Sequence, residues 1–325
     1  MPQKLTDDQL QALKAAGTKY RKDLLAMPLA LLQPVLAHMT MRTNVRGKEV
    51  VGEISEGAEI RPYRSAKDAV EGIPEVTLRE LETFLGDVVR EFDPNMLLGT
   101  LFTDRVATPL TDREIARKMA FLMAQSVSNK FYKAIWSAKR NASGSTTMDL
   151  FDGFATIIDN EITDKNITSD KGNFADLGSI NEANVGDKLL EAYNDAVSEE
   201  LQSESRIKLF VPRSVYNQYN KWYLAEFGSV AYNKEFKKTF LEGTDDTVEL
   251  VPMTGLKDTG KVIFTVRDNM LVGCDQMSDM EQVEIRRPDN PKALQFFMML
   301  YFGVQLESIS PQRLLVGQFT TTTGE

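Results

Sequence analysis

The chain has 325 residues, of which 42% are hydrophobic and 26% are charged, and its formal net charge is -9 at pH 7. This hydrophobic content excludes a disordered chain, because it suffices to bury one large core or two smaller ones. We expect two lobes.

The charge is distributed unevenly along the chain. Residues 1–50 carry eight Lys/Arg and four Asp/Glu, whereas residues 141–205 carry three Lys/Arg and fourteen Asp/Glu. One interpretation is a solubilising surface with chance asymmetry. The other is that the two regions face different partners or different sides of an assembly, and the sequence leaves both open.

A single cysteine, Cys274, and a single histidine, His38, restrict the possible chemistry. One thiol excludes an internal disulfide and a CxxC metal site, and one imidazole excludes most zinc sites. His38 lies in an apolar run and is predicted to be packed or interfacial, while Cys274 follows a predicted strand and is expected to be buried. With no signal peptide and no apolar run near 18 residues, we expect a soluble cytoplasmic product without a membrane segment.

The first 95 residues predict an arm followed by a hairpin. An apolar segment over 24–41 is interrupted by Pro28 and Pro34, which prevent one continuous helix. Such an arm either caps its own core or lies along a neighbouring subunit. Glycines, prolines and short apolar pieces over 44–75 indicate a two-stranded hairpin that requires a partner surface. Residues 76–89 are predicted to be an extended run that returns to the body.

A long helix is predicted from Thr111 to Arg140. Thr111 and Glu114 form a T-x-x-E capping box, no Gly or Pro interrupts the segment, and Gly144 is placed to end it in the left-handed conformation. At about 1.5 Å per residue the helix would be roughly 45 Å long, which suggests an elongated subunit. Its apolar stripe comprises Ile115, Met119, Leu122, Met123, Val127, Phe131, Ala134, Ile135 and Ala138.

The remaining chain predicts a mixed α/β lobe and then a return to strands. In the lobe we expect helices over 181–201 and 212–227 and strands over 207–211, 248–251, 262–266 and 270–273, with a tight connection at 267–269. The last part predicts strands over 283–287, 294–309 and 314–319. We expect these last strands to pack on the apolar stripe of the long helix.

No strong catalytic or metal-binding motif accompanies these elements. The sequence has no glycine-rich phosphate loop. The acidic pairs Asp245–Asp246 and Glu199–Glu200 would serve acid–base chemistry only if burial shifted their pKa values. A group of carboxylates, Asp268, Asp275, Asp279 and Glu281, lacks the spacing of a calcium loop and favours a solvated turn. The sequence therefore predicts no catalytic, cofactor-binding or metal-binding residues.

The order of these parts, with the pieces Leu250–Leu256, Met270–Gly273 and Ser310–Phe319, resembles the HK97-type major capsid protein of tailed phages. The resemblance covers nearly the whole chain, and its best local signal is the closing Pro-x-x-hydrophobic-hydrophobic-x-Gly-x-Phe from Pro311. It implies an α+β fold with four parts. These are an N-terminal arm (1–43), an extended hairpin or E-loop (44–95), a peripheral domain with a spine helix (96–145 and 276–325, helix 111–140) and an axial domain (146–275).

The resemblance implies a structural protein rather than an enzyme. Its copies would assemble through pentamers and hexamers into an icosahedral or prolate shell around double-stranded phage DNA. The expected partners are further copies of the chain, a separate scaffolding protein, a portal protein and nonspecifically bound DNA, with no membrane and no cofactor. The expected location is the virion, assembled in the bacterial host cytoplasm. The residues expected at subunit contacts are Leu24, Leu29, Leu32, Val35, Arg61, Arg64, Lys67 and Glu71.

Two departures from the family pattern qualify this interpretation. The chain reaches its arm almost at once, so we expect a separate scaffold or none of the removable scaffolding segment that many relatives carry. Some relatives form Lys–Asn cross-links with help from a glutamate, and Lys67 is suitably placed on the hairpin. Matching from Pro311, however, puts Leu294 and Tyr301 where the asparagine and glutamate would lie. We therefore expect a shell held by noncovalent contacts.

Three alternatives remain open. An encapsulin-like shell has the same fold but encloses enzyme cargo. Another virion component, such as an adaptor or portal, forms a single ring. A soluble carboxylate hydrolase would depend on Asp245 and Asp246.

Overall fold

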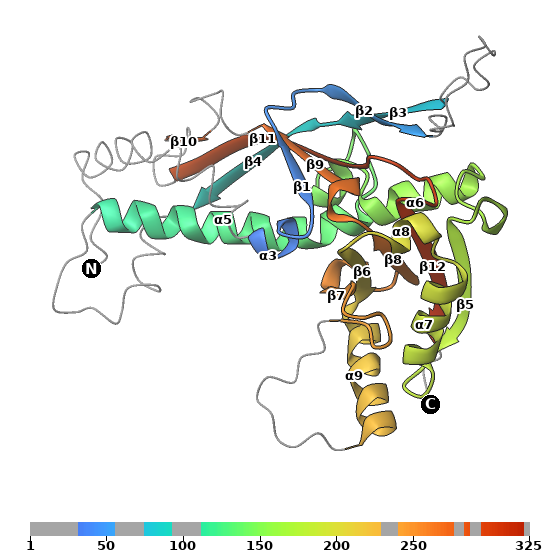
Figure 1. Cartoon of the computed structure of the whole chain (residues 1–325). Helices are drawn as coiled ribbons and strands as arrows, with labels where there is room; N and C mark the ends of the chain where they lie inside the picture. The colour runs from blue at the N-terminus through green and yellow to red at the C-terminus, as the bar shows by residue number, and fades with distance from the viewer. Residues whose placement is uncertain are drawn as a thin grey trace, which may run out of the picture. The chain divides into compact units, whose positions relative to one another are not determined.

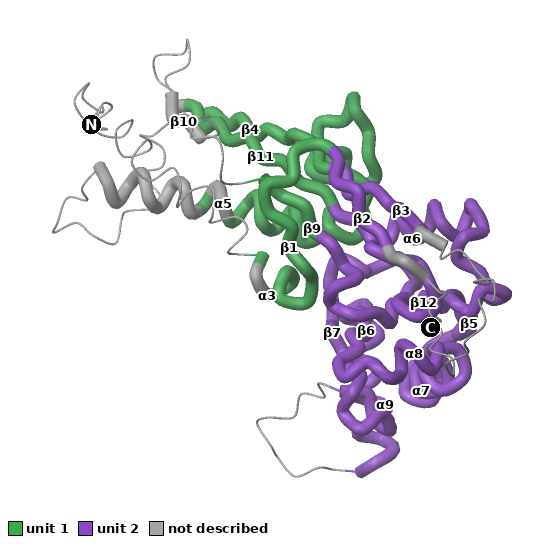
Figure 2. The backbone as a smooth tube through the Cα atoms, turned by 45° about the horizontal axis from the view of Figure 1, so that its top comes forward, with its two compact units in different colours: residues 1–47, 83–153, 272–303 green, residues 48–82, 154–271, 304–325 purple. Residues whose placement is uncertain are grey.

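The computed structural model describes residues 32–55, 75–92, 112–228, 240–275, 283–286 and 294–321 (Figure 1). The chain divides into two compact units, shown in Figure 2. Unit 1 comprises residues 1–47, 83–153 and 272–303, and unit 2 comprises residues 48–82, 154–271 and 304–325. The sequence grouped 276–325 with the long helix, whereas residues 304–325 lie in unit 2.

A five-stranded sheet organises unit 1. Its order is β1-β9-β11-β10, and β4 also pairs with β11. β4 and β11 are antiparallel, with register from Leu294 opposite Phe92 to Phe302 opposite Phe84. The predicted long strand over 294–309 is confirmed as a strand, ending at Leu306. The bounds are Thr40–Thr43 (β1), Phe84–Phe92 (β4), Met270–Asp275 (β9), Val283–Arg286 (β10) and Leu294–Leu306 (β11).

The long helix of unit 1 is α5, Asp112–Ser137. Its buried side chains include Val127, Phe131, Ala134 and Ile135, as the predicted stripe requires, but Leu122 is exposed. Phe131 meets the rings of Phe151 and Phe302, so α5 covers the face of β11 on which Phe302 lies.

The helix ends earlier than the predicted Arg140. After Ser137 the backbone bonds to a different segment: the N–H of Lys139 donates to the carbonyl of Met148, and the N–H of Gly153 donates to that of Ala138. These two bonds pair the N–H of Lys139 and the carbonyl of Ala138, which would bond within the helix if the helix continued. The prediction that Gly144 ends the helix in the left-handed conformation is wrong, because Gly144 is not among the positive-φ glycines. η1, Thr147–Asp149, follows this crossing.

The described part of the N-terminal arm begins with a short helix, α3, Gln33–Leu36. Pro34 lies in its first turn, where the missing N–H costs no helical hydrogen bond. Leu32, Val35, Leu36 and Met39 are buried.

A hairpin is present as β2, Lys48–Ser55, antiparallel to β3, Glu75–Glu82. Its second strand lies almost entirely in the run that the sequence assigned to the return to the body, beyond the predicted range of 44–75. Thr83, the residue directly after β3, forms hydrogen bonds with the segment directly before β2, and both belong to unit 1. Its hydroxyl donates to the carbonyl of Val45 and accepts from the N–H of Gly47. Gly47 has φ +85, a conformation that favours glycine.

A second five-stranded sheet, of mixed direction, forms the core of unit 2 in the order β5-β12-β8-β6-β7. β12 pairs parallel with β5 and antiparallel with β8, which explains why the C-terminal residues lie in this unit. The bounds are Phe174–Ile180 (β5), Ile207–Pro212 (β6), Val248–Met253 (β7), Lys261–Thr265 (β8) and Leu314–Thr321 (β12). β5 was not predicted, because its apolar and polar residues do not alternate regularly. In the structure only two of its seven side chains are buried.

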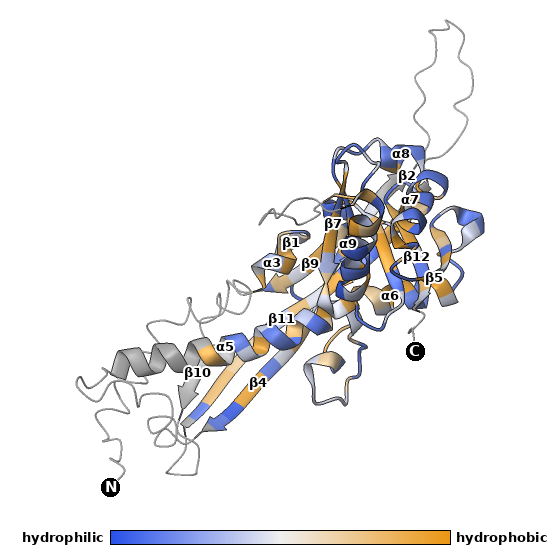
Figure 3. Cartoon of the chain, turned by 90° about the horizontal axis from the view of Figure 1, so that it is seen from below, coloured by the Kyte–Doolittle hydropathy of each residue, from blue (hydrophilic) through white to orange (hydrophobic). Residues whose placement is uncertain are grey.

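Helices α7 and α9 pack against each other and against this sheet, whose strands are coloured mainly hydrophobic in Figure 3. Gly186 of α7 permits the close approach, since a Cβ there would lie 2.3 Å from the ring of Trp222. The helical bounds are Phe154–Thr163 (α6), Val185–Asp195 (α7), Glu199–Gln202 (α8) and Arg213–Phe227 (α9). Short 3-10 helices span Ser169–Lys171 (η2), Thr254–Leu256 (η3) and Arg267–Asn269 (η4).

Two sequence predictions for this region are corrected. The single helix over 181–201 is two helices, because Ser198 caps α8 by accepting from the N–H of Leu201. The tight connection at 267–269 joins strands of different sheets, β8 and β9, rather than the two strands of a hairpin. Among the described residues, no helix is both long and apolar enough to span a membrane.

Candidate assembly surfaces

The structure separates the residues that the sequence proposed for subunit contacts. Leu24, Leu29, Arg61, Arg64, Lys67 and Glu71 lie outside the described residues. Leu32 is 0% exposed and Val35 is 2% exposed. These two side chains are therefore already buried within a single chain. Their packing on a neighbouring subunit stays a prediction.

The hairpin presents two different faces. Residues directly opposite in an antiparallel ladder point to the same side, so Val50, Gly52, Leu78 and Glu80 share one face, and Val51, Arg79 and Leu81 share the other. Val51 and Leu81 are buried, whereas Val50 is 62% exposed and Leu78 is 67% exposed. We call the exposed side, defined by Val50 and Leu78, the hairpin face.

An exposed ion pair borders the hairpin face. Lys48 Nζ lies 2.6 Å from Glu80 Oε2, and both side chains are 56% exposed. The hydrogen bond to Glu80 raises the pKa of Lys48 above its ordinary value. Glu82, directly opposite Lys48, lies on the same side. The face therefore combines apolar contact area with charges of both signs, a composition typical of a surface that binds another protein.

A second apolar surface lies on the β4–β11 ladder, on the side that α5 does not cover. Leu85 and Val89 are exposed, and their opposite residues Tyr301 and Phe297 are half-buried, as is Met299 between them. Figure 3 shows that β4 carries both hydrophobic and hydrophilic residues. We call these five residues the sheet face. The exposed Asp87, opposite Met299, lies among them on the same side. Five neighbouring large side chains on one exposed surface are the usual mark of an interaction site, here with one carboxylate at its centre.

The end of α9 carries a third apolar group. Leu224 and Phe227 are exposed, and the ring of Phe227 contacts those of Trp222 and Tyr223. Gly228, with φ +76, follows the helix. This group is smaller than the sheet face.

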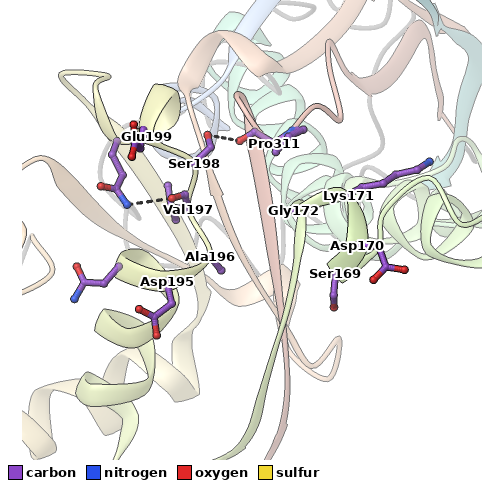
Figure 4. Close-up of a pocket in the computed structure, with 12 residues that line it drawn as sticks. Ser169, Asp170, Lys171, Gly172, Asp195, Ala196, Val197, Ser198, Glu199 and Pro311 are labelled. Carbon is purple, nitrogen blue, oxygen red and sulfur yellow. Dashed lines mark hydrogen bonds between the residues drawn. The ribbon is translucent and has the colours of Figure 1, made fainter.

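A polar groove of about 580 Å³ lies in unit 2 where η2 meets the end of α7 and the start of α8 (Figure 4). Ser198 donates to the carbonyl of Pro311, and Gln202 donates to that of Val197, so these side chains are engaged in holding the loops. The charged groups at its rim are all exposed: Asp170, Lys171, Asp195 and Glu199. The groove is open and offers no buried group suited to acid–base chemistry.

Five of the acidic candidates from the sequence occupy ordinary surface positions. Asp245 and Asp246 are exposed in a turn with positive φ, and Glu199 and Glu200 are exposed in α8. Asp268 is exposed, Asp275 is buried and pairs with Arg46, and Asp279 and Glu281 lie outside the described residues. Within the described ranges, no group of three His, Cys, Asp or Glu side chains could hold a metal ion.

Neither the hairpin face nor the sheet face was identified from the sequence. The sequence of the second strand does not reveal which side of a two-stranded hairpin is covered. The sheet face depends on the pairing of β4 with β11, two segments far apart in the chain.

Comparison with known proteins identifies the architecture. No protein-family model matches the chain, and no curated protein matches it. Among solved structures, the procapsid of satellite phage P4, which includes the size-determination (Sid) protein, matches with a TM-score of 0.59 at 11% identity, over 99% of this chain and 93% of that chain. The chain has the HK97-type capsid fold. The predicted α+β fold class is therefore confirmed.

Other structures with the HK97-type fold match over slightly shorter lengths. A structure from Gordonia phage Cozz has a TM-score of 0.52 at 14% identity, covering 90% of this chain and 87% of that chain. The holo-SrpI encapsulin complex from Synechococcus elongatus has a TM-score of 0.50 at 13% identity, covering 87% and 86%. At these identities the likeness establishes the fold and not the contents of any particle.

Proposed function

We propose that this chain is the major capsid protein of a tailed phage or prophage, a structural protein that assembles into a closed shell around double-stranded DNA. The observation that carries the proposal is the HK97-type fold over nearly the whole chain, matched by the P4 procapsid. Phage structures and the capsid of a GTA particle share this fold with the chain, the latter with a TM-score of 0.53.

The two exposed apolar faces support assembly. Both the hairpin face and the sheet face expose large side chains that a partner would bury. The contact we propose joins the hairpin face of one subunit to the sheet face of the next. Because it joins two different surfaces, it is heterologous and can close rings of five and six copies.

The domain assignment stays part of the proposal. We infer an N-terminal arm over 1–43, an E-loop over 44–95, a peripheral domain over 96–145 and 276–325, and an axial domain over 146–275. In this scheme Leu24 and Leu29 of the arm, and Arg61, Arg64, Lys67 and Glu71 of the E-loop, contact neighbouring subunits. The acidic region over 141–205 would converge at the ring centre, and the basic residues of 1–50 would face DNA through nonspecific phosphate contacts.

Further partners and the location follow from the same proposal. We infer a separate scaffolding protein, a portal protein, assembly in the bacterial host cytoplasm and a final place in the virion. Tyr301 lies in the sheet face at the position where relatives with cross-links carry a glutamate. We therefore propose noncovalent subunit contacts. Covalent ladders from intact particles on a denaturing gel would contradict that part.

Electron microscopy of the expressed protein, with and without the scaffolding gene beside its own, tests the proposal directly. We expect closed shells of uniform size, built from pentamers and hexamers. A single ring would indicate an adaptor or portal instead, and a monomer or small oligomer under all conditions would refute a shell protein.

An encapsulin-like shell is the second candidate, favoured by the likeness to the SrpI encapsulin complex. Analysis of the contents of purified particles separates the two. Double-stranded DNA supports the phage capsid, whereas enclosed enzyme without DNA supports the encapsulin-like shell.

A further inference from the structure

Arg79 of β3 holds the hairpin to the rest of unit 2. Its Nη2 donates to Glu161 Oε1 of α6 at 2.7 Å and to Gln305 Oε1 of β11 at 3.2 Å. Its Nε donates to the carbonyl of Leu306 at 3.0 Å. The planar guanidinium thus reaches three acceptors from two elements, which a lysine cannot reproduce. We call these four residues the clasp.

The acceptors of the clasp are themselves fixed. Asn166 Nδ2 donates to the second carboxylate oxygen of Glu161 at 2.8 Å. Gln305 Nε2 donates to the carbonyl of Glu80 at 3.0 Å, which adds a main-chain bond beside Arg79. The Arg79 and Glu161 side chains are only 11% and 16% exposed, so the pair is largely shielded from water.

Glu161 occupies a position that helix stability does not favour. It lies in the last turn of α6, where the partial negative charge of the helix end repels a carboxylate, and that turn contains no basic residue. The cation that compensates it comes from the hairpin. The location of this carboxylate is therefore explained by its pairing with Arg79 rather than by α6 alone.

The clasp acts on one side of the hairpin only. Arg79 shares its face with Val51 and Leu81, both buried, whereas the opposite hairpin face is exposed. Lys48 and Glu80 also form an ion pair, but both partners belong to the hairpin, so that pair cannot fix its direction.

We propose that Arg79 is a positioning residue: the clasp fixes the direction in which the hairpin leaves unit 2, and so sets the geometry of the contact between the hairpin face and a second copy of the chain. The second half of this proposal rests on the proposed function, but the first half concerns the single subunit and can be tested without any particle.

The test measures the hairpin's position in unassembled subunits by pulsed electron paramagnetic resonance. Nitroxide labels are placed at Leu78→Cys on the hairpin and Glu191→Cys on α7, two exposed positions within unit 2. Cys274 is buried and burial raises its thiol pKa to about 11, so it stays unlabelled at pH 7. We expect a narrow distance distribution when the clasp is intact.

Arg79→Ala is expected to broaden this distribution and to lower the population at the original distance by about tenfold, because removing one partner leaves a shielded charge uncompensated. The distance distribution of Arg79→Lys should be broader than that of the parent and narrower than that of Arg79→Ala. Lys48→Ala is the matched control: it removes an exposed ion pair from the same hairpin and should leave the distribution unchanged.

The amide exchange of the β2–β3 ladder is measured in the same variants. Protected ladder amides with a broadened distribution mean a formed but displaced hairpin, as proposed. If the ladder amides of Arg79→Ala lose this protection, the hairpin itself has unfolded, and the label distances of Arg79→Lys are used for the test instead. An unchanged distribution in the variant whose hairpin remains formed overturns the proposal.

Particle assembly is examined separately. If the clasp positions the hairpin and the parent chain forms shells, Arg79→Ala subunits should assemble into shells of irregular size or curvature. If the label distances respond to Arg79→Ala but the parent protein forms no shell, the clasp stands and the proposed function fails. If the parent forms shells and the label distances do not respond, the clasp fails alone.

Discussion

Phe131 of α5 and Phe302 of β11 lie with their ring centroids 4.7 Å apart and their ring planes tilted by 59°. Phe151 completes the group, 5.1 Å from Phe302. Tilted aromatic pairs at this separation stabilise a core beyond the area that they bury. The cluster joins the long helix, the loop that follows it and the long strand.

Phe302→Ala should lower the free energy of unfolding by about 3–5 kcal/mol, because it leaves a cavity between α5 and β11. Urea denaturation of the unassembled subunit measures the change. Leu85→Ala, on the exposed side of the same ladder, is the control and should cost less than about 1 kcal/mol. Equal losses in the two variants would contradict the assignment of the α5 side as the buried one.

Leu32→Ala distinguishes a residue of the subunit core from a residue of the interface. Since Leu32 is buried within its own chain, we expect the isolated subunit to lose about 2–5 kcal/mol of stability. Thermal or chemical unfolding of unassembled protein measures this. A variant with unchanged subunit stability and failed assembly would support the prediction that Leu32 contacts a neighbour.

Val50→Asp combined with Leu78→Asp should block assembly without unfolding the subunit. Both side chains are exposed, so each change should alter subunit stability by only about 0.5 kcal/mol, while a charge buried against an apolar partner is strongly unfavourable. Particle yield by sedimentation and electron microscopy is the measurement. The double variant Val50→Ile and Leu78→Met keeps the face apolar and should still assemble. Normal particles from the aspartate variant would exclude the hairpin face as a contact.

The buried thiol of Cys274 should lower the free energy of unfolding at high pH. Burial, with a smaller contribution from Asp275, raises the thiol pKa from 9.0 to about 11. The folded chain therefore holds this proton where the unfolded chain has lost it, so this contribution to stability falls as pH rises from about 9 to about 11.

Urea titrations across this interval compare the parent with Cys274→Ala, which should lack this part of the decline. The thiol of the folded parent should also react slowly with a disulfide reagent at pH 8 and quickly after denaturation. Rapid reaction of the folded protein would show that the thiol is accessible.

The sequence by itself determined those elements whose signal is local. α9 begins directly after Pro212 and is followed by Gly228, while β6 through β9 were marked by short apolar runs between turn residues. The long strand from Leu294 was identified by its aromatic residues and its later alternation. The order of these parts was also sufficient for the resemblance to HK97-type capsid proteins, because proteins with few identical residues can still share the same order of helices and strands.

Only the tertiary structure decided features that depend on competing partners. α5 stops at Ser137 because residues 148–153 supply other hydrogen bonds to the chain that follows, and a helical pattern cannot reveal such a competitor. Leu32 and Leu78 are equally apolar in the sequence, yet one is buried and the other is exposed. The pairing of Arg79 with Glu161 joins segments far apart in the chain, and neither residue shows its partner until the fold brings them together.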